Sequence, residues 1–202
     1  MRDNDYVITT KELVQWCQEE GLDLDKITPS KFDSVLGEGT GAGMIFGNTG
    51  GVMEAALRTV YRVLEGKEAP ADFYQLRPVR GLSNRKEAEV TIAGKKLRVC
   101  ILYGTAAAEK FLAEDMNGYH FVEVMTCPGG CISGAGQPDC GSVPVSDVVR
   151  KKRIQSLYQA DEQAERRNSM DNPEIGTIYH EFFKEPLSML SEKLLHTTYK
   201  GK

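Results

Sequence analysis

The sequence of 202 residues predicts an α/β fold in which a sheet flanked by helices is followed by a helical tail. Two segments of alternating apolar residues flank a turn near Gly94, which is typical of paired strands. A stripe of apolar residues at helical spacing covers residues 52–64. Strand signals are lost in the C-terminal part, where charged helical patterns take over. We therefore expect an α/β body over residues 1–145 and a helical segment over residues 146–202.

A first helix is expected directly after a short β-branched segment. Thr9 and Glu12 have the spacing of a capping box, which places the helix start there, and Gly21 is suited to end it. Three apolar side chains then share one face of this helix: Leu13, Trp16 and Cys17. Because free cysteines are usually buried, Cys17 is expected to be a core thiol.

Residues 37–51, GEGTGAGMIFGNTGG, contain seven glycines and lead into the second helix, which Gly66 should close. Its expected apolar stripe consists of Val52, Ala55, Ala56, Thr59, Val60, Val63 and Leu64. A helix that begins behind a glycine-rich loop offers free N–H groups and a positive dipole end to an anion.

The same loop matches a relaxed dinucleotide fingerprint at GEGTGA, residues 37–42. It does not lie between a clear strand and an immediate helix, and the acidic residue of that motif is missing. No G-K-[ST] sequence follows, so a P-loop is excluded. The alternative, close helix packing through small residues, is favoured over nucleotide binding.

The middle of the chain alternates between strands and a helix. Strands are expected on both sides of Gly94, with Cys100 as a packing residue in the second. An alanine-rich helix over residues 106–116 should follow Thr105. The next strand, YHFVEVM at residues 119–125, is apolar enough to be central in the sheet.

The tail should begin with a long charged helix after Ser146. Its basic run RKKR, residues 150–153, is expected to be a solvated helix face because acidic residues follow it. Asn172 and Pro173 form an N-cap and first-turn pair for another helix, and residues 186–196 should form a last short helix or turn.

Composition excludes several classes of function. The formal net charge of −4 and the pI near 5.5 argue against a nucleic-acid partner, because there is no broad cationic surface. No apolar run approaches the roughly 18 residues that cross a bilayer, so no membrane partner is expected. The polar N-terminus resembles neither a signal nor a transit peptide. The expected location is cytoplasmic, where the five cysteines should be reduced, which favours metal binding or catalysis over a disulfide framework.

Two of these cysteines, Cys127 and Cys131, lie in a glycine-rich loop. Glycines let the backbone approach a bulky group closely and leave N–H groups free to point at sulfides, which suits an iron–sulfur cluster. Zinc prefers tighter knuckles with a second ligand pair, and the histidines show no such spacing. From spacing alone, two buried loop cysteines without a role remain an equal alternative.

The loop sequence EVMTCPGGCISGAGQP, residues 123–138, closely resembles the last cysteine signature of the iron-only (FeFe) hydrogenases. Three further segments resemble that family in the same order: YVITTKEL at 6–13, the glycine-rich segment at 39–61, and the tail at 157–199. The resemblance covers nearly the whole chain. It implies the C-terminal lobe of the H-cluster domain, followed by a segment similar to the small subunit.

In that family the H-cluster is a 4Fe–4S cubane joined through one cysteine thiolate to a two-iron subcluster. The resemblance implies that Cys127 is a cubane ligand and that Cys131 is both a cubane ligand and the bridge. It also implies that Met125 packs against the two-iron unit and that Phe46 and Val52 line the same pocket. It further implies that the two-iron unit carries carbon monoxide and cyanide ligands, and that the backbone of the glycine loop at Gly47, Gly50 and Gly51 lies close to them.

Two earlier cysteine motifs of the family, resembling T-S-C-C-P and P-C-x-x-K-K, do not occur in the sequence. Two of the four cubane ligands and the proton-relay thiol are therefore expected from an N-terminal hydrogenase lobe or subunit. Cys140 could offer a third ligand, although the family does not use that position. Asn48 and Ala135 vary the usual pattern away from the ligands.

The expected activity is the reversible reduction of protons to dihydrogen by the complete enzyme, with ferredoxin or another electron carrier as partner. Two alternatives stay open. Hydrogenase-like iron–sulfur assembly proteins share the cysteine loop and hold cubanes without catalysis. An inactive truncated fragment would also show this sequence, although the intact helix caps and apolar stripes disfavour it.

Overall fold

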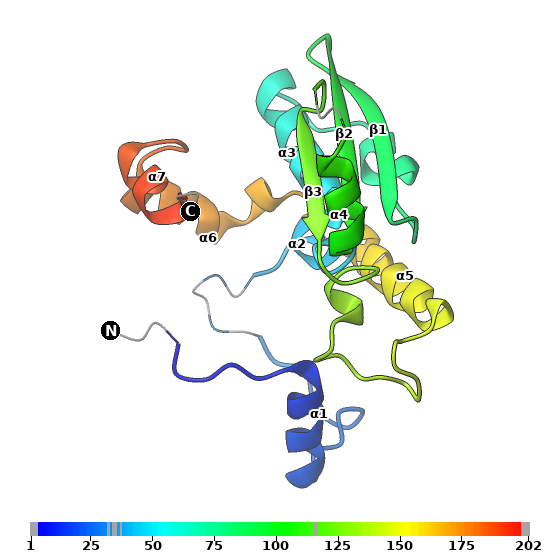
Figure 1. The fold of residues 1–202 in the computed structure, drawn as a ribbon. Helices are drawn as coiled ribbons and strands as arrows, with labels where there is room; N and C mark the ends of the chain where they lie inside the picture. The colour runs from blue at the N-terminus through cyan, green and yellow to red at the C-terminus, as the bar shows by residue number, and fades with distance from the viewer. Residues whose placement is uncertain (1–3, 32, 34–35, 37, 115–116, 199–202) are drawn as a thin grey trace.

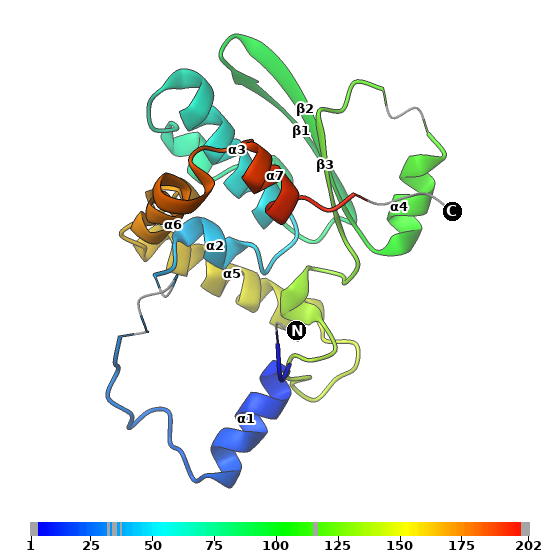
Figure 2. The same cartoon turned by 90° about the vertical axis from the view of Figure 1, so that its left-hand side faces the viewer.

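The computed structural model describes residues 4–31, 33, 36, 38–114 and 117–198. The strands are β1 (Arg85–Ile92), β2 (Lys95–Tyr103) and β3 (Phe121–Met125). The helices are α1 (Thr10–Glu19), α2 (Gly41–Ile45), α3 (Gly51–Glu65), α4 (Thr105–Leu112), α5 (Asp147–Gln163), α6 (Pro173–Ile178) and α7 (Met189–Leu195). The predicted α/β class is confirmed, and Figures 1 and 2 together show α3 and α4 on opposite sides of the sheet.

The sheet has the order β1-β2-β3. β1 and β2 are antiparallel around a turn at Ala93 and Gly94, where both residues have positive φ, as the sequence predicted near Gly94. β2 and β3 are parallel, with α4 between them in the chain. The prediction that the apolar strand β3 is central is wrong for the described residues: β3 is an edge strand there, and β2 is central.

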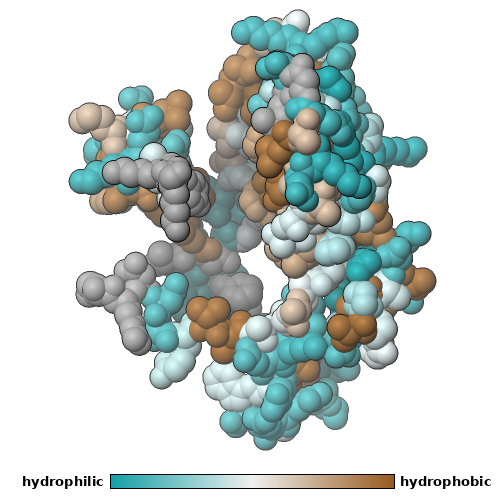
Figure 3. Space-filling view, in the orientation of Figure 1, coloured by the Kyte–Doolittle hydropathy of each residue, from teal (hydrophilic) through white to brown (hydrophobic). Residues whose placement is uncertain are grey.

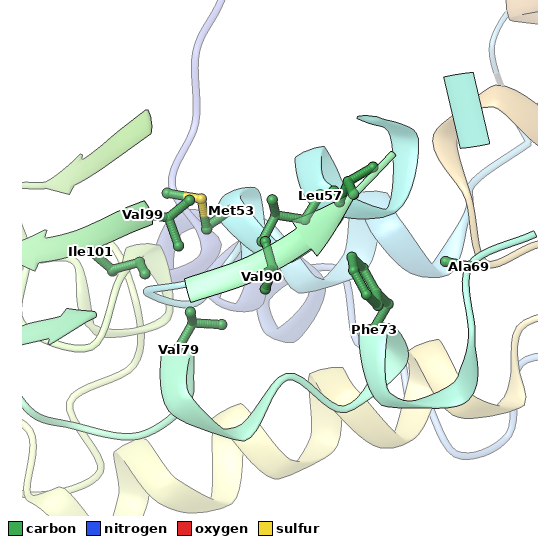
Figure 4. Packing of buried hydrophobic residues seen from close by; sticks show 9 residues of the cluster. Met53, Leu57, Ala69, Phe73, Val79, Val90, Val99 and Ile101 are labelled. Carbon is green, nitrogen blue, oxygen red and sulfur yellow. The ribbon is translucent and has the colours of Figure 1, made fainter. Parts of the chain in front are cut away.

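The main core lies between α3 and the sheet. Figure 4 shows Met53 and Leu57 of α3 packed against Val90, Val99 and Ile101 of the two antiparallel strands. A smaller cluster on the other face joins Cys100, Leu102 and Phe111. The prediction that Cys100 is a packing residue is confirmed, since its side chain is fully buried.

The predicted apolar stripe of α3 is right in part. Ala55 is buried and Val60 packs against the main core, but Val63 and Leu64 are 61% and 54% exposed. Glu54 and Arg58, which were not predicted, are fully buried. The buried charges pair with each other and, across the helix interface, with Asp161 of α5, at N–O distances of 2.8 Å. Hydrophobic periodicity could not find this face because its burial depends on ion pairing rather than on apolar area. The predicted closure at Gly66 is confirmed, with φ +66°.

Helix α1 has the predicted start but not the predicted environment. The capping box of Thr9 and Glu12 is present. The helix buries none of its residues, and Cys17 is only partly covered, so the prediction of a core thiol is wrong. Figures 1 and 2 both show α1 standing away from the sheet, which explains why its apolar face stays open. Figure 3 shows polar and apolar side chains mixed over the surface, including the lower part, where α1 lies in Figure 1.

The tail follows the sequence closely. Ser146 caps α5, Asn172 caps α6 with Pro173 in its first turn, and the last expected helix is α7. α5 packs against α2, and both helices contribute to one apolar cluster. The helix after Gly104 is shorter than predicted, because α4 ends at Leu112, and positions 115–116 lie outside the described residues. None of the helices in the described ranges is both long and apolar enough to cross a membrane.

Candidate functional site

The two predicted ligand cysteines follow directly after the edge strand. β3 ends at Met125, and the loop then turns through two glycines with positive φ, Gly129 and Gly130. A 3₁₀ turn begins at Cys131. Both thiols are free; Cys127 is partly buried and Cys131 is exposed. The buried-loop alternative is therefore wrong for Cys131, whose thiol is accessible for bonding.

The cysteine loop, residues 127–138, lies against the glycine loop, residues 40–51. Two backbone hydrogen bonds join them: the amide of Ile132 donates to the carbonyl of Gly47 at 3.0 Å, and that of Thr49 donates to the carbonyl of Gly129 at 3.1 Å. A Cβ atom on Gly130 would lie 2.7–2.8 Å from backbone atoms of residues 47–49. The structure thus brings together the two segments that the sequence singled out.

The glycines of this loop pair mainly make room for the protein itself. A Cβ atom on Gly51 would lie 1.7 Å from the carbonyl oxygen of Ile45, and one on Gly50 would lie 2.1 Å from that of Val79. Such distances exclude any side chain without a backbone shift. Close packing through small residues, the alternative favoured over nucleotide binding, is confirmed at these two positions.

The N-terminus of α3 already holds an anion, which is the carboxylate of Glu123 in β3. Its two oxygens accept hydrogen bonds from the amides of Gly50 at 2.6 Å and Met53 at 2.7 Å. Burial raises the pKa of Glu123, against the opposing effect of the two amides and of Lys86. The helix end does hold an anion, as expected, but the anion is a side chain from the sheet, which takes the amides of Gly50 and Met53.

Lys86 of β1 ties the same region to the sheet. Its ammonium donates to the carbonyls of Thr49 at 2.9 Å and Gly81 at 3.2 Å. Burial lowers the pKa of Lys86 to about 8, although the charge of Glu123 acts in the opposite direction. Neither Glu123 nor Lys86 was predicted from the sequence. For Glu123 the available signal was a charged residue inside an apolar strand, because a buried charge needs a partner. Lys86 stands among charged residues at the start of β1 and gave no such signal.

The basic run 150–153 divides between water and the cysteine loop. Lys151 and Lys152 are exposed, as predicted for a solvated face. Arg153 instead donates to the carbonyls of Ile132 at 2.6 Å and Pro138 at 2.5 Å. The prediction is wrong for the two arginines, because the helix turns them toward the body while their charges still find oxygen acceptors. Arg150 lies over Gly129, with its Cδ atom 3.4 Å from the position of a Cβ there.

The remaining predicted site residues lie at the ends of neighbouring elements. Phe46 ends the short helix α2 and is 45% exposed, and Val52 in the first turn of α3 is partly buried. Met125 is also partly buried, and its carbonyl accepts a hydrogen bond from Gly104. The contact of each of these side chains with a cofactor stays a prediction.

Cys127 and Cys131 could supply two of the four thiolate ligands that a cubane needs. Cys127 and Cys131 are free thiols on an accessible loop, and soft thiolates are the ligands that iron–sulfur clusters use. Within the described ranges no group of three or more His, Cys, Asp or Glu side chains is placed to hold a metal ion. Cys140 has φ +53°, and its sulfur lies 3.3 Å from the guanidinium of Arg153. With Cys127 and Cys131 as the predicted ligands, a four-ligand cluster needs two more.

Comparison with protein families gives two adjacent matches. Residues 1–135 match the model of the iron-only hydrogenase large subunit, C-terminal domain, and residues 147–202 match that of the iron hydrogenase small subunit. The predicted division at residue 145/146 stays a prediction.

Known relatives align with nearly the whole chain. Iron hydrogenase 1 of Clostridium pasteurianum is 39% identical over 204 residues, which cover 99% of this chain and 35% of the relative. The cytosolic Fe-S cluster assembly factor narfl of Xenopus tropicalis is 29% identical, over 98% of this chain and 41% of that protein.

A solved structure, a variant of FeFe-hydrogenase HydA1 from Chlamydomonas reinhardtii, matches with a TM-score of 0.73 and 34% identity. The match covers 96% of this chain and 55% of that one. The chain thus spans about a third of the curated relatives that it matches and about half of the solved structure. With its paired glycine and cysteine loops and its two consecutive family matches, the chain belongs to the iron-only (FeFe) hydrogenase family.

Proposed function

We propose that this chain forms one lobe of an FeFe hydrogenase and supplies two of the cysteine ligands of its H-cluster. The complete enzyme would combine two protons and two electrons into dihydrogen, reversibly. One observation carries the proposal: the loop with the free thiols of Cys127 and Cys131 is hydrogen-bonded onto the glycine loop, and Cys131 remains exposed. A rigid backing with an accessible thiol is what a ligand loop needs.

The roles of individual residues follow from their places. Cys127 and Cys131 would hold the cubane, and Cys131 would also reach the two-iron subcluster. When bound, the two-iron unit would supply the metal at which protons and electrons combine. Phe46, Val52 and Met125 would give that unit apolar neighbours, and apolar side chains keep water from a metal site. The backbone near Gly47, Gly50 and Gly51 would complete the enclosure.

The partner that completes the site would be an N-terminal hydrogenase lobe or subunit. The outer edge of β3 is unpaired within the described residues, and exposed strand edges favour the addition of another strand. Beside it runs an apolar surface groove lined by Ala56, Leu57, Val60, Leu97, Val99, His120 and Phe121. Exposed apolar surface of this kind marks an interface. Ferredoxin or another carrier would deliver electrons, and the cytoplasm is the proposed location.

A second candidate is a non-catalytic role in cluster assembly. The assembly factor of Xenopus tropicalis aligns with 98% of this chain, and Cys127 and Cys131 are thiols that could hold a cubane whether or not a two-iron unit is present. The two candidates differ in one requirement. A hydrogenase needs a two-iron subcluster next to Cys131, whereas an assembly factor would hold a cubane without it.

The test is anaerobic reconstitution with iron and sulfide, first of the chain alone and then with an N-terminal hydrogenase lobe added. Iron per chain, the electron paramagnetic resonance spectrum and hydrogen evolution after addition of a two-iron precursor are measured. We expect a stable cluster and hydrogen only with the added lobe. Cys127→Ser and Cys131→Ser should lose both, and the matched control Cys140→Ser should keep both.

Other outcomes select between the alternatives. A cluster of about four irons on the chain with the added lobe, without hydrogen evolution, would favour the assembly role. The same iron content on the isolated chain, lost in Cys140→Ser, would show that Cys140 is a third ligand. No iron with either preparation would contradict the proposal, and the alternative of an inactive truncated fragment would remain.

A further inference from the structure

We propose that Arg153 is a positioning residue for the cysteine loop: it holds the backbone on the C-terminal side of Cys131 from a helix of the small-subunit-like segment. This inference rests on the proposed function, in which Cys131 is a metal ligand. It assigns to residues 147–202 a direct part in shaping the metal site, beyond their match to the small-subunit family.

The geometry of the guanidinium carries the inference. Nη1 of Arg153 donates to the carbonyl of Ile132 at 2.6 Å, and Nη2 donates to the carbonyl of Pro138 at 2.5 Å. The two acceptors stand on either side of the glycine-containing stretch 133–137. A planar fork can bridge two carbonyls in fixed directions, whereas the single ammonium of a lysine cannot reproduce both. The first acceptor belongs to the residue directly after Cys131.

Arg153 is itself presented by a firmly anchored helix. Tyr158 and Asp161 of α5 are buried against the body. The Asp161 carboxylate accepts hydrogen bonds from Arg58 at 2.8–2.9 Å and from Arg167 at 2.6 Å. Burial by itself would raise the pKa of Asp161, but these two guanidinium groups outweigh it and lower the pKa. The ion pairs of Asp161 with Arg58 and Arg167 therefore fix the helix from which Arg153 reaches the loop.

The loop has few other ties on this side. The far end of the loop contacts the first turn of α1. The amide of Lys11 donates to the carbonyl of Gly136 at 3.0 Å, and the ammonium of Lys11 pairs with Asp139 at 3.1 Å. Helix α1 has no buried residues, so this contact gives the loop no firm support. A stretch with four glycines between residues 129 and 136 has much conformational freedom to lose. Gly129 and Ile132 are already hydrogen-bonded to the glycine loop, so Arg153 adds a second attachment to the buried body, on the C-terminal side of Cys131.

The test compares Arg153→Gln and Arg153→Lys with the wild-type chain, using Lys152→Gln as matched control on the exposed side of the same helix. Hydrogen–deuterium exchange is measured on the metal-free chain for peptides from the loop, 127–138, and from the central strand, 95–103. We expect loop exchange to become at least tenfold faster in Arg153→Gln and strand exchange to stay within twofold. Arg153→Lys should lie between, because it keeps the charge but loses the fork. Lys152→Gln should match wild type.

A second measurement connects the loop to the metal. On the chain reconstituted with the added N-terminal lobe, the rate of iron loss to a chelator should rise severalfold in Arg153→Gln and stay unchanged in Lys152→Gln. Equal acceleration of loop and strand exchange would overturn the proposal, because the residue would then act only on global stability. Unchanged loop exchange, or faster loop exchange with unchanged iron loss, would also overturn it.

Failure of the proposed function would look different. If the wild-type chain binds no iron with the added lobe, the metal role of Cys131 fails, and with it the positioning role. The exchange measurement still decides whether Arg153 holds the loop, because it uses the metal-free chain.

Discussion

Of helices α1 and α3, the one with a complete local cap is exposed and the one without a side-chain cap of its own is buried. α1 has a complete capping box at Thr9 and Glu12, yet none of its residues is buried. α3 begins at Gly50 without a side-chain cap of its own, yet it forms the centre of the molecule. Its cap comes from Glu123, 73 positions further along the chain.

Capping chemistry and tertiary packing therefore govern different properties of a helix. Local caps decide where a helix can begin, because they satisfy orphan N–H groups at its end. Whether the helix is then buried depends on what the rest of the chain places beside it. α3 receives a carboxylate cap from β3 and the ion-pair partner Asp161 from α5, whereas α1 buries no residue against the body.

Removing Arg58 should break the attachment of α3 to α5. Arg58 is fully buried between Glu54 and Asp161, so Arg58→Ala leaves carboxylates buried with fewer cationic partners. We expect the free energy of unfolding to fall by about 3–5 kcal/mol. The measurement is urea unfolding followed by circular dichroism. In α1 the exposed pair Gln15 and Glu19 has the same spacing, and Gln15→Ala should cost less than about 0.5 kcal/mol. Similar costs for both variants would contradict the contrast.

Removing the remote cap should be the next largest effect. Glu123→Ala leaves the buried amides of Gly50 and Met53 without acceptors, which costs roughly 2–4 kcal/mol of unfolding free energy. Urea unfolding gives the total, and hydrogen exchange of residues 50–54 should show the local loss. A cost below about 1 kcal/mol would mean that α3 does not depend on the carboxylate.

Lys86 should make stability depend on pH near the same helix end. Its pKa in the folded chain is about 8, below its ordinary value of 10.5, because burial disfavours the charged form. Between these two pH values the unfolded chain holds a proton that the folded chain has released. The contribution of Lys86 to the free energy of unfolding therefore rises with pH across this window, by up to about 3 kcal/mol.

The measurement subtracts two curves, because tyrosines and other lysines also titrate at high pH. Unfolding free energies of the wild-type chain and of Lys86→Met are compared from pH 7 to pH 10.5. We expect the difference, wild type minus variant, to increase through this range. A flat difference would show that the buried lysine has the same pKa in both states.

Removing the local cap of α1 should have the smallest effect. Thr9→Ala deletes the acceptor of the Glu12 amide, which costs about 1 kcal/mol of local helix stability. Because α1 buries none of its residues, the unfolding midpoint of the body should stay unchanged. Hydrogen exchange of residues 10–19 measures the local change. A drop in the midpoint of the whole chain would show that α1 is coupled to the body.

Local signals in the sequence predicted most of the elements. The caps at Thr9, Ser146 and Asn172 each begin a helix, and the turn at Gly94 joins two antiparallel strands. The cysteine loop was identifiable as a site from its residue types and its resemblance to a family signature. These features depend on neighbours within a few positions, which a sequence displays directly.

The surroundings of these elements could not be predicted in the same way. The edge position of β3, the exposed face of α1 and the buried charges of α3 all depend on contacts between distant segments. Arg153 looked like part of a solvated basic run, and only the packing of α5 turned it toward the loop. A charged side chain gives no periodic signal for burial, because its partner can stand anywhere in the chain.

The α/β class, most helix starts and the two thiols that could hold a cluster follow from the amino-acid sequence alone. That Glu123 fills the anion site of α3, and that the glycines at positions 50, 51 and 130 make room for neighbouring backbone, follows only from the folded arrangement. The two sets of features differ in the sequence distance over which the interacting residues are separated. Backbone conformation and capping are fixed by near neighbours, whereas a buried charge or a close backbone approach exists only once distant segments have met.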